Sequence, residues 1–82
     1  MYKIKAPDGS NNICGKNVAK FRKQLKPALS QRKFAVKLQV MGYDVDQQFV
    51  RRIETGERFV TDIEILILAK ALGVSVEQLL EK

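Results

Sequence analysis

The chain has 82 residues, a length that fits one domain close to the lower limit for folding without a disulfide or a metal. Hydrophobic residues make up 45% of it, which is enough for a compact core, and the single cysteine, Cys14, excludes an internal disulfide framework. We interpret the Cys14 thiol as a small buried hydrophobic group.

Composition also argues against catalysis. The chain has no histidine and one cysteine, so the usual spacings supply no metal cluster, catalytic triad or dyad. The glycines are isolated, so there is no glycine-rich phosphate loop. We therefore expect no enzymatic activity, no cofactor and no metal. Because neither a secretory signal nor an apolar run long enough to cross a bilayer is present, we expect a cytoplasmic protein with no membrane contact.

Charge is distributed unevenly along the chain. The 15 Lys and Arg residues exceed the 9 Asp and Glu residues, which gives a net charge of +6. Residues 1–58 hold 13 basic and 5 acidic groups, whereas residues 59–82 hold 2 basic and 4 acidic groups. A basic N-terminal part, followed by a mildly acidic C-terminal part, fits a protein that binds a polyanion with one face. An ordinary solvated surface rich in lysine explains the charge equally well.

The first twelve residues predict a tail. Tyr2 and Ile4 alternate with lysines, and this alternation ends at "PDG", residues 7–9, whose residue types favour a turn. That pattern fits either a mobile arm or a short strand. We treat residues 1–12 as a flexible N-terminal tail and residues 13–82 as one domain.

Helical spacing begins at residue 13. The first predicted helix covers about residues 13–26 and ends before Pro27. Its inner face consists of Val18, Phe21, Arg22 and Leu25. The second helix begins after Ser30 as N-cap and stops at Gly42, expected as a left-handed residue. Its inner face consists of Phe34, Ala35 and Leu38, and its outer face carries Arg32, Lys33 and Lys37.

Three further helices follow, and no strand pattern is present after residue 12. Asp46 is the expected N-cap of a third helix that runs to about Thr55 and ends at Gly56. Two capping boxes then open the fourth and fifth helices, one formed by Thr61 and Glu64 and one by Ser75 and Gln78. The inward-facing residues predicted for these last helices are Ile65, Leu68, Ala69 and Leu72, then Val76, Leu79 and Leu80. The fold class is therefore all-α, a bundle of five helices.

The third helix has two chemically different sides. On a helical wheel Val50 and Ile53 share one side. The other side carries Gln48, Arg51 and Arg52, with Gln47 at its flank in the first turn. Gln pairs bidentately with adenine and Arg with guanine, so this side suits the major groove of DNA. Both residue types are also good formers of an ordinary exposed helix face.

The order of these motifs resembles the Cro and lambda-repressor type of helix-turn-helix domain, the XRE family, over residues 13–80. The pieces that carry the resemblance are Arg22, "LSQ" at 29–31, Phe34-Ala35, Gly42, "IETG" at 53–56 and "LAKALGVSVEQLL" at 68–80. The spacings from Arg22 to Gln31 and from Ala35 to Glu54 are longer than the family usually has. They predict a longer first loop, an extended second helix and a lengthened turn before the third helix.

The resemblance implies roles for particular residues. Gln47, Gln48 and Arg52 match the base-reading positions of the family, and Arg51 lies on the same exposed face. Contacts with the DNA backbone are expected from Gln31, which opens the second helix, and from Arg58. The family pattern also pairs an arginine with a glutamate at the positions of Arg22 and Glu54, which implies a buried ion pair that locks the third helix against the first. An exposed Glu54 at a helix end is the alternative.

The function that we expect is sequence-specific binding to double-stranded DNA by a small bacterial or phage transcriptional repressor. A homodimer on a two-fold operator is the expected working form. Val76, Leu79 and Leu80 either contribute to a dimer contact or close the core. Two alternatives remain: an antitoxin or adaptor module that binds a protein partner, with nucleic acid secondary, and an RNA-binding protein.

Overall fold

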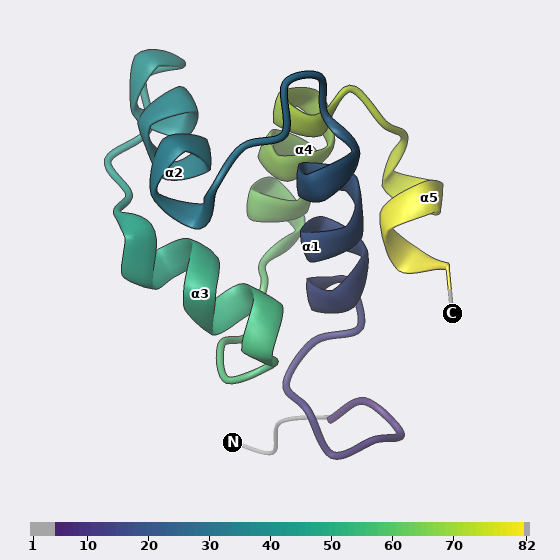
Figure 1. Cartoon of the computed structure of the whole chain (residues 1–82). Helices are drawn as coiled ribbons and strands as arrows, with labels where there is room; N and C mark the ends of the chain where they lie inside the picture. The colour runs from purple at the N-terminus through teal and green to yellow at the C-terminus, as the bar shows by residue number, and fades with distance from the viewer. Residues whose placement is uncertain (1–4, 82) are drawn as a thin grey trace.

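The computed structural model describes residues 5–81, which form five helices and no strand (Figure 1). Their bounds are α1 Gly15–Gln24, α2 Gln31–Val40, α3 Gln47–Thr55, α4 Asp62–Leu72 and α5 Val76–Leu80. In Figure 1, α2 and α3 lie on one side of the molecule, α1 and α4 form its centre, and α5 covers the opposite side. The predicted all-α class and the five predicted helices are confirmed.

Every helix contributes apolar side chains to one core. The largest fully buried side chains are those of Phe34, Leu38, Ile53, Leu68, Leu79, Val18, Val50 and Cys14. Burying one Val, Leu, Ile or Phe side chain stabilises the fold by about 1.5–3 kcal/mol. The core therefore joins α3 to the rest of the bundle through Val50 and Ile53, both with 0% exposure.

The predicted start signals are present at four helices. Ser30, Asp46, Thr61 and Ser75 each accept a hydrogen bond from the backbone N–H three residues further on. Thr61 and Ser75 do so within complete capping boxes. Such side chains satisfy N–H groups that have no partner inside the helix.

The connection between α2 and α3 is long, as the spacing predicted. α2 has ten residues, and residues 41–46 separate it from α3. Gly42 has φ +102°, a conformation that L side chains rarely adopt, and it turns the chain out of α2. The Gln39 amide then donates to the Val45 carbonyl over 2.7 Å. The extended second helix and the lengthened turn are therefore part of this fold.

The last helix differs from its predicted packing. Leu79 is fully buried and Val76 is partly buried, but Leu80 is 39% exposed. The prediction that Leu80 turns inward was wrong, because α5 has only five residues and offers its inner face chiefly to Leu79. Leu79 closes the core.

Residues 1–4 of the predicted tail lie outside the described residues. Residues 5–10 form a turn in which the Ala6 N–H donates to the Ser10 carbonyl over 2.8 Å. Asn11 and Asn12 hydrogen-bond to the chain just after α3. Among the described residues, no helix combines the length and the apolar character needed to cross a membrane.

Neighbouring leucines on α5 test the packing. Leu79→Ala removes a fully buried side chain and is expected to lower the free energy of unfolding by about 2–5 kcal/mol. Leu80→Ala is expected to cost less than about 1 kcal/mol, because its side chain keeps much of its contact with water. Urea denaturation of both variants measures the two costs, and equal losses would contradict this packing.

Candidate nucleic-acid interface

α3 presents its polar residues to solvent. Gln47, Gln48, Arg51 and Arg52 are all exposed, whereas Val50 and Ile53 are completely buried. The Arg51 Nε donates to the Gln48 Oε1 over 2.9 Å, so these two side chains already lie together on the surface. The structure therefore brings the four residues predicted to read bases onto the exposed part of one helix.

Basic side chains flank this surface. α2 exposes Arg32, Lys33 and Lys37, and neither α2 nor the exposed side of α3 carries an acidic side chain. The one acidic residue within α3, Glu54, is turned into the bundle and neutralised there. Exposed carboxylates lie outside the two helices, at Asp44 and Asp46 before α3 and at Glu57 after it. The excess of positive charge on α2 and α3 themselves is what an approaching phosphate backbone requires.

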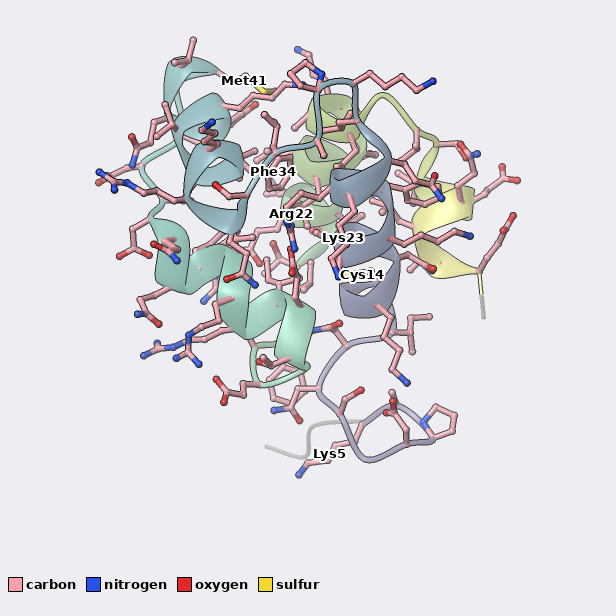
Figure 2. All side chains as sticks on the ribbon, viewed as in Figure 1. Lys5, Cys14, Arg22, Lys23, Phe34 and Met41 are labelled. Atoms are coloured by element: carbon pink, nitrogen blue, oxygen red, sulfur yellow. The ribbon has the colours of Figure 1, made fainter. Side chains whose placement is uncertain are left out.

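An ion pair joins α3 to α1. The Arg22 Nε donates to the Glu54 Oε2 over 2.7 Å, and the Arg22 Nη2 donates to the Glu54 Oε1 over 3.0 Å. The side chains are only 10% and 6% exposed. In Figure 2, Arg22 lies at the centre of the molecule, between α1 and α3. The structure thus brings together the two residues expected to pair, in the bidentate geometry that strengthens an Arg–carboxylate contact.

The same pair also holds the start of α2. The Arg22 Nη1 donates to the Leu29 carbonyl over 2.8 Å, and the Gln31 Nε2 donates to the Glu54 Oε1 over 3.0 Å. Gln31 was predicted as a contact for the DNA backbone, and here its amide is oriented by Glu54. An amide nitrogen has two N–H groups, so Gln31 keeps one donor for another acceptor. Sequence reasoning had not predicted this link among three helices.

Arg58 lies in a second polar cluster. Its Nη2 donates to the Glu64 Oε2, and its guanidinium lies 4.8 Å from the centroid of the Phe49 ring. Glu64 in turn accepts from the Thr61 N–H as part of the α4 capping box. Arg58 therefore connects the turn after α3 to the start of α4, and its predicted contact with the DNA backbone stays a prediction.

The charges around Glu64 change its acidity. Burial raises the pKa of the Glu64 carboxyl, but hydrogen bonds from the Thr61 backbone and from Arg58, together with the Arg58 charge, outweigh burial and hold the pKa below its usual value of 4.5. The ionised carboxylate is therefore the form that the fold prefers.

Two residues near the interface were missed by sequence reasoning. The sequence assigned Asn11 and Asn12 to the tail, yet both hydrogen-bond to the end of α3. Asn12 donates to a carbonyl in the last turn of α3 and to one just after it, and Asn11 donates to a carbonyl just after the helix. Asparagines just before a helix are common capping residues, which is a signal for the bond from the Gly15 N–H to Asn12 but not for the bonds to the end of α3. Among the described residues, no group of three or more side chains is arranged to hold a metal ion.

A comparison with protein families assigns the chain. Residues 18–79, about three quarters of its length, match the model of the helix-turn-helix family HTH_3. The chain belongs to this family, which confirms the resemblance to the Cro and lambda-repressor type. No curated protein and no solved structure matched the chain. The class defined by the fold and the family is that of DNA-binding transcription regulators.

A double-mutant cycle tests the ion pair. Arg22→Ala or Glu54→Ala alone leaves the other charge buried without its partner and is expected to cost about 3–5 kcal/mol of stability. The double variant is expected to lose clearly less than the sum of the single losses, because the two groups interact directly. Urea denaturation supplies the free energies, and additive losses would show that the pair is not coupled.

The pH dependence of stability tests the Arg58–Glu64 contact. The pKa of Glu64 is lower in the folded chain than in the unfolded chain, where it is 4.5. The stability that the ionised Glu64 contributes is therefore fully present above pH 4.5 and is lost as the pH falls through the folded-state pKa. Glu64→Gln removes this titration and is expected to flatten the loss of stability below about pH 5. Thermal unfolding from pH 7 to pH 3 measures the slope, with Glu77→Gln, an exposed residue of α5, as the control. Identical acid slopes for wild type and Glu64→Gln would contradict the pKa assignment.

Proposed function

We propose that the chain is a sequence-specific regulator that binds double-stranded DNA, of the bacterial or phage repressor type, and that it works as a homodimer in the cytoplasm. The observation that carries the proposal is the division of α3, whose apolar side is buried while Gln47, Gln48, Arg51 and Arg52 are all exposed. A helix with such a face fits the major groove, where base edges present distinct donors and acceptors.

In this proposal the exposed residues of α3 have separate roles. Gln48 and Arg52 lie one turn apart and contact base edges, each good pair contributing about 1–3 kcal/mol of discrimination. Gln47 begins the helix and approaches the bases from the first turn. Arg51 lies beside Gln48 and contacts either a base or a phosphate.

The DNA backbone is proposed to contact α2 and the turn after α3. Gln31 is the first residue of a ten-residue helix, so its amide and the N-terminal N–H groups of α2 favour a phosphate there. Arg32 and Lys33, both exposed in the same turn, add charge. Arg58, whose side chain is 39% exposed while its Nη2 donates to Glu64, adds a further phosphate contact in this proposal. Such contacts position the protein without selecting a sequence.

A single domain of this size offers few base contacts, so we propose a dimer. Two copies related by a two-fold axis place two α3 helices about one turn of DNA apart, roughly 34–36 Å. Leu80, exposed at the end of α5, is available for such a contact, whereas Leu79 belongs to the core.

One observation favours the alternative function, a protein-interaction module with secondary nucleic-acid binding. Ile63 and Leu66 are 67% and 60% exposed and lie three residues apart on α4. Exposed aliphatic neighbours of this kind occur in protein interfaces. Binding to random duplex DNA at rising salt separates the two functions, since neutralising phosphates gives a steep salt dependence and a protein partner does not. Structured RNA that outcompetes duplex DNA would indicate an RNA-binding protein instead.

Alanine substitutions on α3 test the proposal. After selection of a bound duplex from a random library, Gln48→Ala and Arg52→Ala are each expected to weaken binding to it by about 1–3 kcal/mol. Each is also expected to relax preference at one base pair of each half-site. Folding should be unaffected, because both side chains are exposed. Gel-shift titration with the selected duplex and its single-base variants measures both effects.

The controls are exposed residues of similar chemistry on other helices. Gln24→Ala on α1 and Lys70→Ala on α4 remove a neutral amide and one positive charge, and neither is expected to alter base preference. If Gln47, Gln48, Arg51 and Arg52 can each be replaced by Ala with wild-type affinity and preference, α3 does not read DNA.

A further inference from the structure

The chain before α1 holds the C-terminal end of α3 through an asparagine clasp, formed by Asn11 and Asn12. The Asn12 Nδ2 donates to the Ile53 carbonyl over 3.2 Å and to the Arg58 carbonyl over 2.7 Å. The Asn12 Oδ1 accepts from the Gly15 N–H over 2.7 Å. One amide thus caps the first N–H of α1 and gives a second donor to the Ile53 carbonyl, which also accepts from the Gly56 N–H over 3.1 Å.

Asn11 continues the clasp along the turn after α3. Its backbone N–H donates to the Gly56 carbonyl over 2.8 Å, and its Nδ2 donates to the Glu57 carbonyl over 2.8 Å. Together the two asparagines occupy the carbonyls of Ile53, Gly56, Glu57 and Arg58. The end of α3 and the turn that follows it are therefore fixed to the start of α1.

The clasp works at very short range between the two helices. Gly15, the first residue of α1, lies so close to α3 that a Cβ atom there would collide with the Ile53 carbonyl oxygen. Figure 1 shows the segment before α1 passing beside the lower end of α3. A backbone contact this close transmits any displacement of one helix end to the other.

The two ends of α3 are held differently. At its start, α3 follows the connection of residues 41–46, where Asp46 caps the helix from an exposed position. At its end, α3 is held by the clasp and by the Glu54 ion pair. Asn11 and Asn12 lie before residues 18–79, the part of the chain that matches the family model. The two asparagines are therefore not part of that match.

We infer that Asn12, supported by Asn11, is a positioning residue for sequence reading by α3. This role rests on the proposed function. Specific base contacts require geometry held within about 0.5 Å. The long connection of residues 41–46 joins only the start of α3, and the clasp fixes its C-terminal end. Asparagine is uncharged, so its loss leaves the electrostatic attraction to any duplex unchanged. Loss of the clasp therefore lowers discrimination and leaves nonspecific binding as it was.

Asn17 provides a matched control. It lies on α1, and its Nδ2 donates to the Leu79 and Glu81 carbonyls over 2.8 Å and 2.6 Å, so it ties α1 to the end of α5 by the same kind of bonds. The test compares Asn12→Ala with Asn17→Ala in the full chain. Affinities for the selected duplex and for a scrambled duplex are measured well below the melting temperature of each variant.

The expected result is a fall of about tenfold in the ratio of specific to nonspecific affinity for Asn12→Ala, the loss of roughly one good base contact. For Asn17→Ala the ratio should change less than about twofold, although its stability falls as well. Equal changes in the two variants, or no change in either, overturn the positioning role.

Two further outcomes are also decisive. If Asn12→Ala does not fold, Asn11→Ala is judged by the same ratio, because it removes only the bond to the Glu57 carbonyl and keeps the backbone bond to Gly56. An unchanged ratio in Asn11→Ala then overturns the role. A wild-type chain that shows no sequence preference overturns the proposed function and this role with it, whereas a normal preference kept by both asparagine variants overturns this role alone.

Discussion

The buried pair of Arg22 and Glu54 is the constraint on which the placement of α3 depends. Taking two charges out of water is costly, and that cost is offset only when the geometry is good and further hydrogen bonds satisfy the remaining atoms. Both conditions hold here: two Arg–carboxylate bonds are joined by bonds from Arg22 to Leu29 and from Gln31 to Glu54. The pair therefore fixes three helices relative to one another at one point.

This arrangement determines which side of α3 meets solvent. Val50 and Ile53 pack into the core on one side of the helix, and Glu54 is tied to α1 next to them. A roll of α3 would break the ion pair and expose apolar surface, so the polar side is held outward. Gln48 and Arg52 are both exposed in this arrangement. Scaffold and interface thus occupy adjacent residues of one short helix.

Local features of this fold were predictable from the sequence because each is determined by a few neighbouring residues. Ser30, Asp46, Thr61 and Ser75 cap helices through bonds to residues three positions away, and the φ of Gly56 follows from its place after α3. The two-sided character of α3 follows from helical periodicity alone.

Contacts between distant segments were not predictable in the same way. Asn12 lies 46 positions before Arg58 in the chain, and no local pattern indicates that its amide meets that carbonyl. The bond from Gln31 to Glu54 and the placement of Arg58 against Phe49 likewise depend on how helices meet. Leu80 was misplaced because a helix of five residues is too short for periodicity to separate its inner and outer sides.

The central claim is that the exposed side of α3 contacts DNA. Titration of the full-length, isotope-labelled chain with a selected duplex, followed by backbone amide chemical shifts, tests it most directly. The account predicts that the largest shifts occur in residues 47–52 and in the first turn of α2, with little change in α5. Largest shifts around Ile63 and Leu66 on α4, with residues 47–52 unchanged, would contradict it.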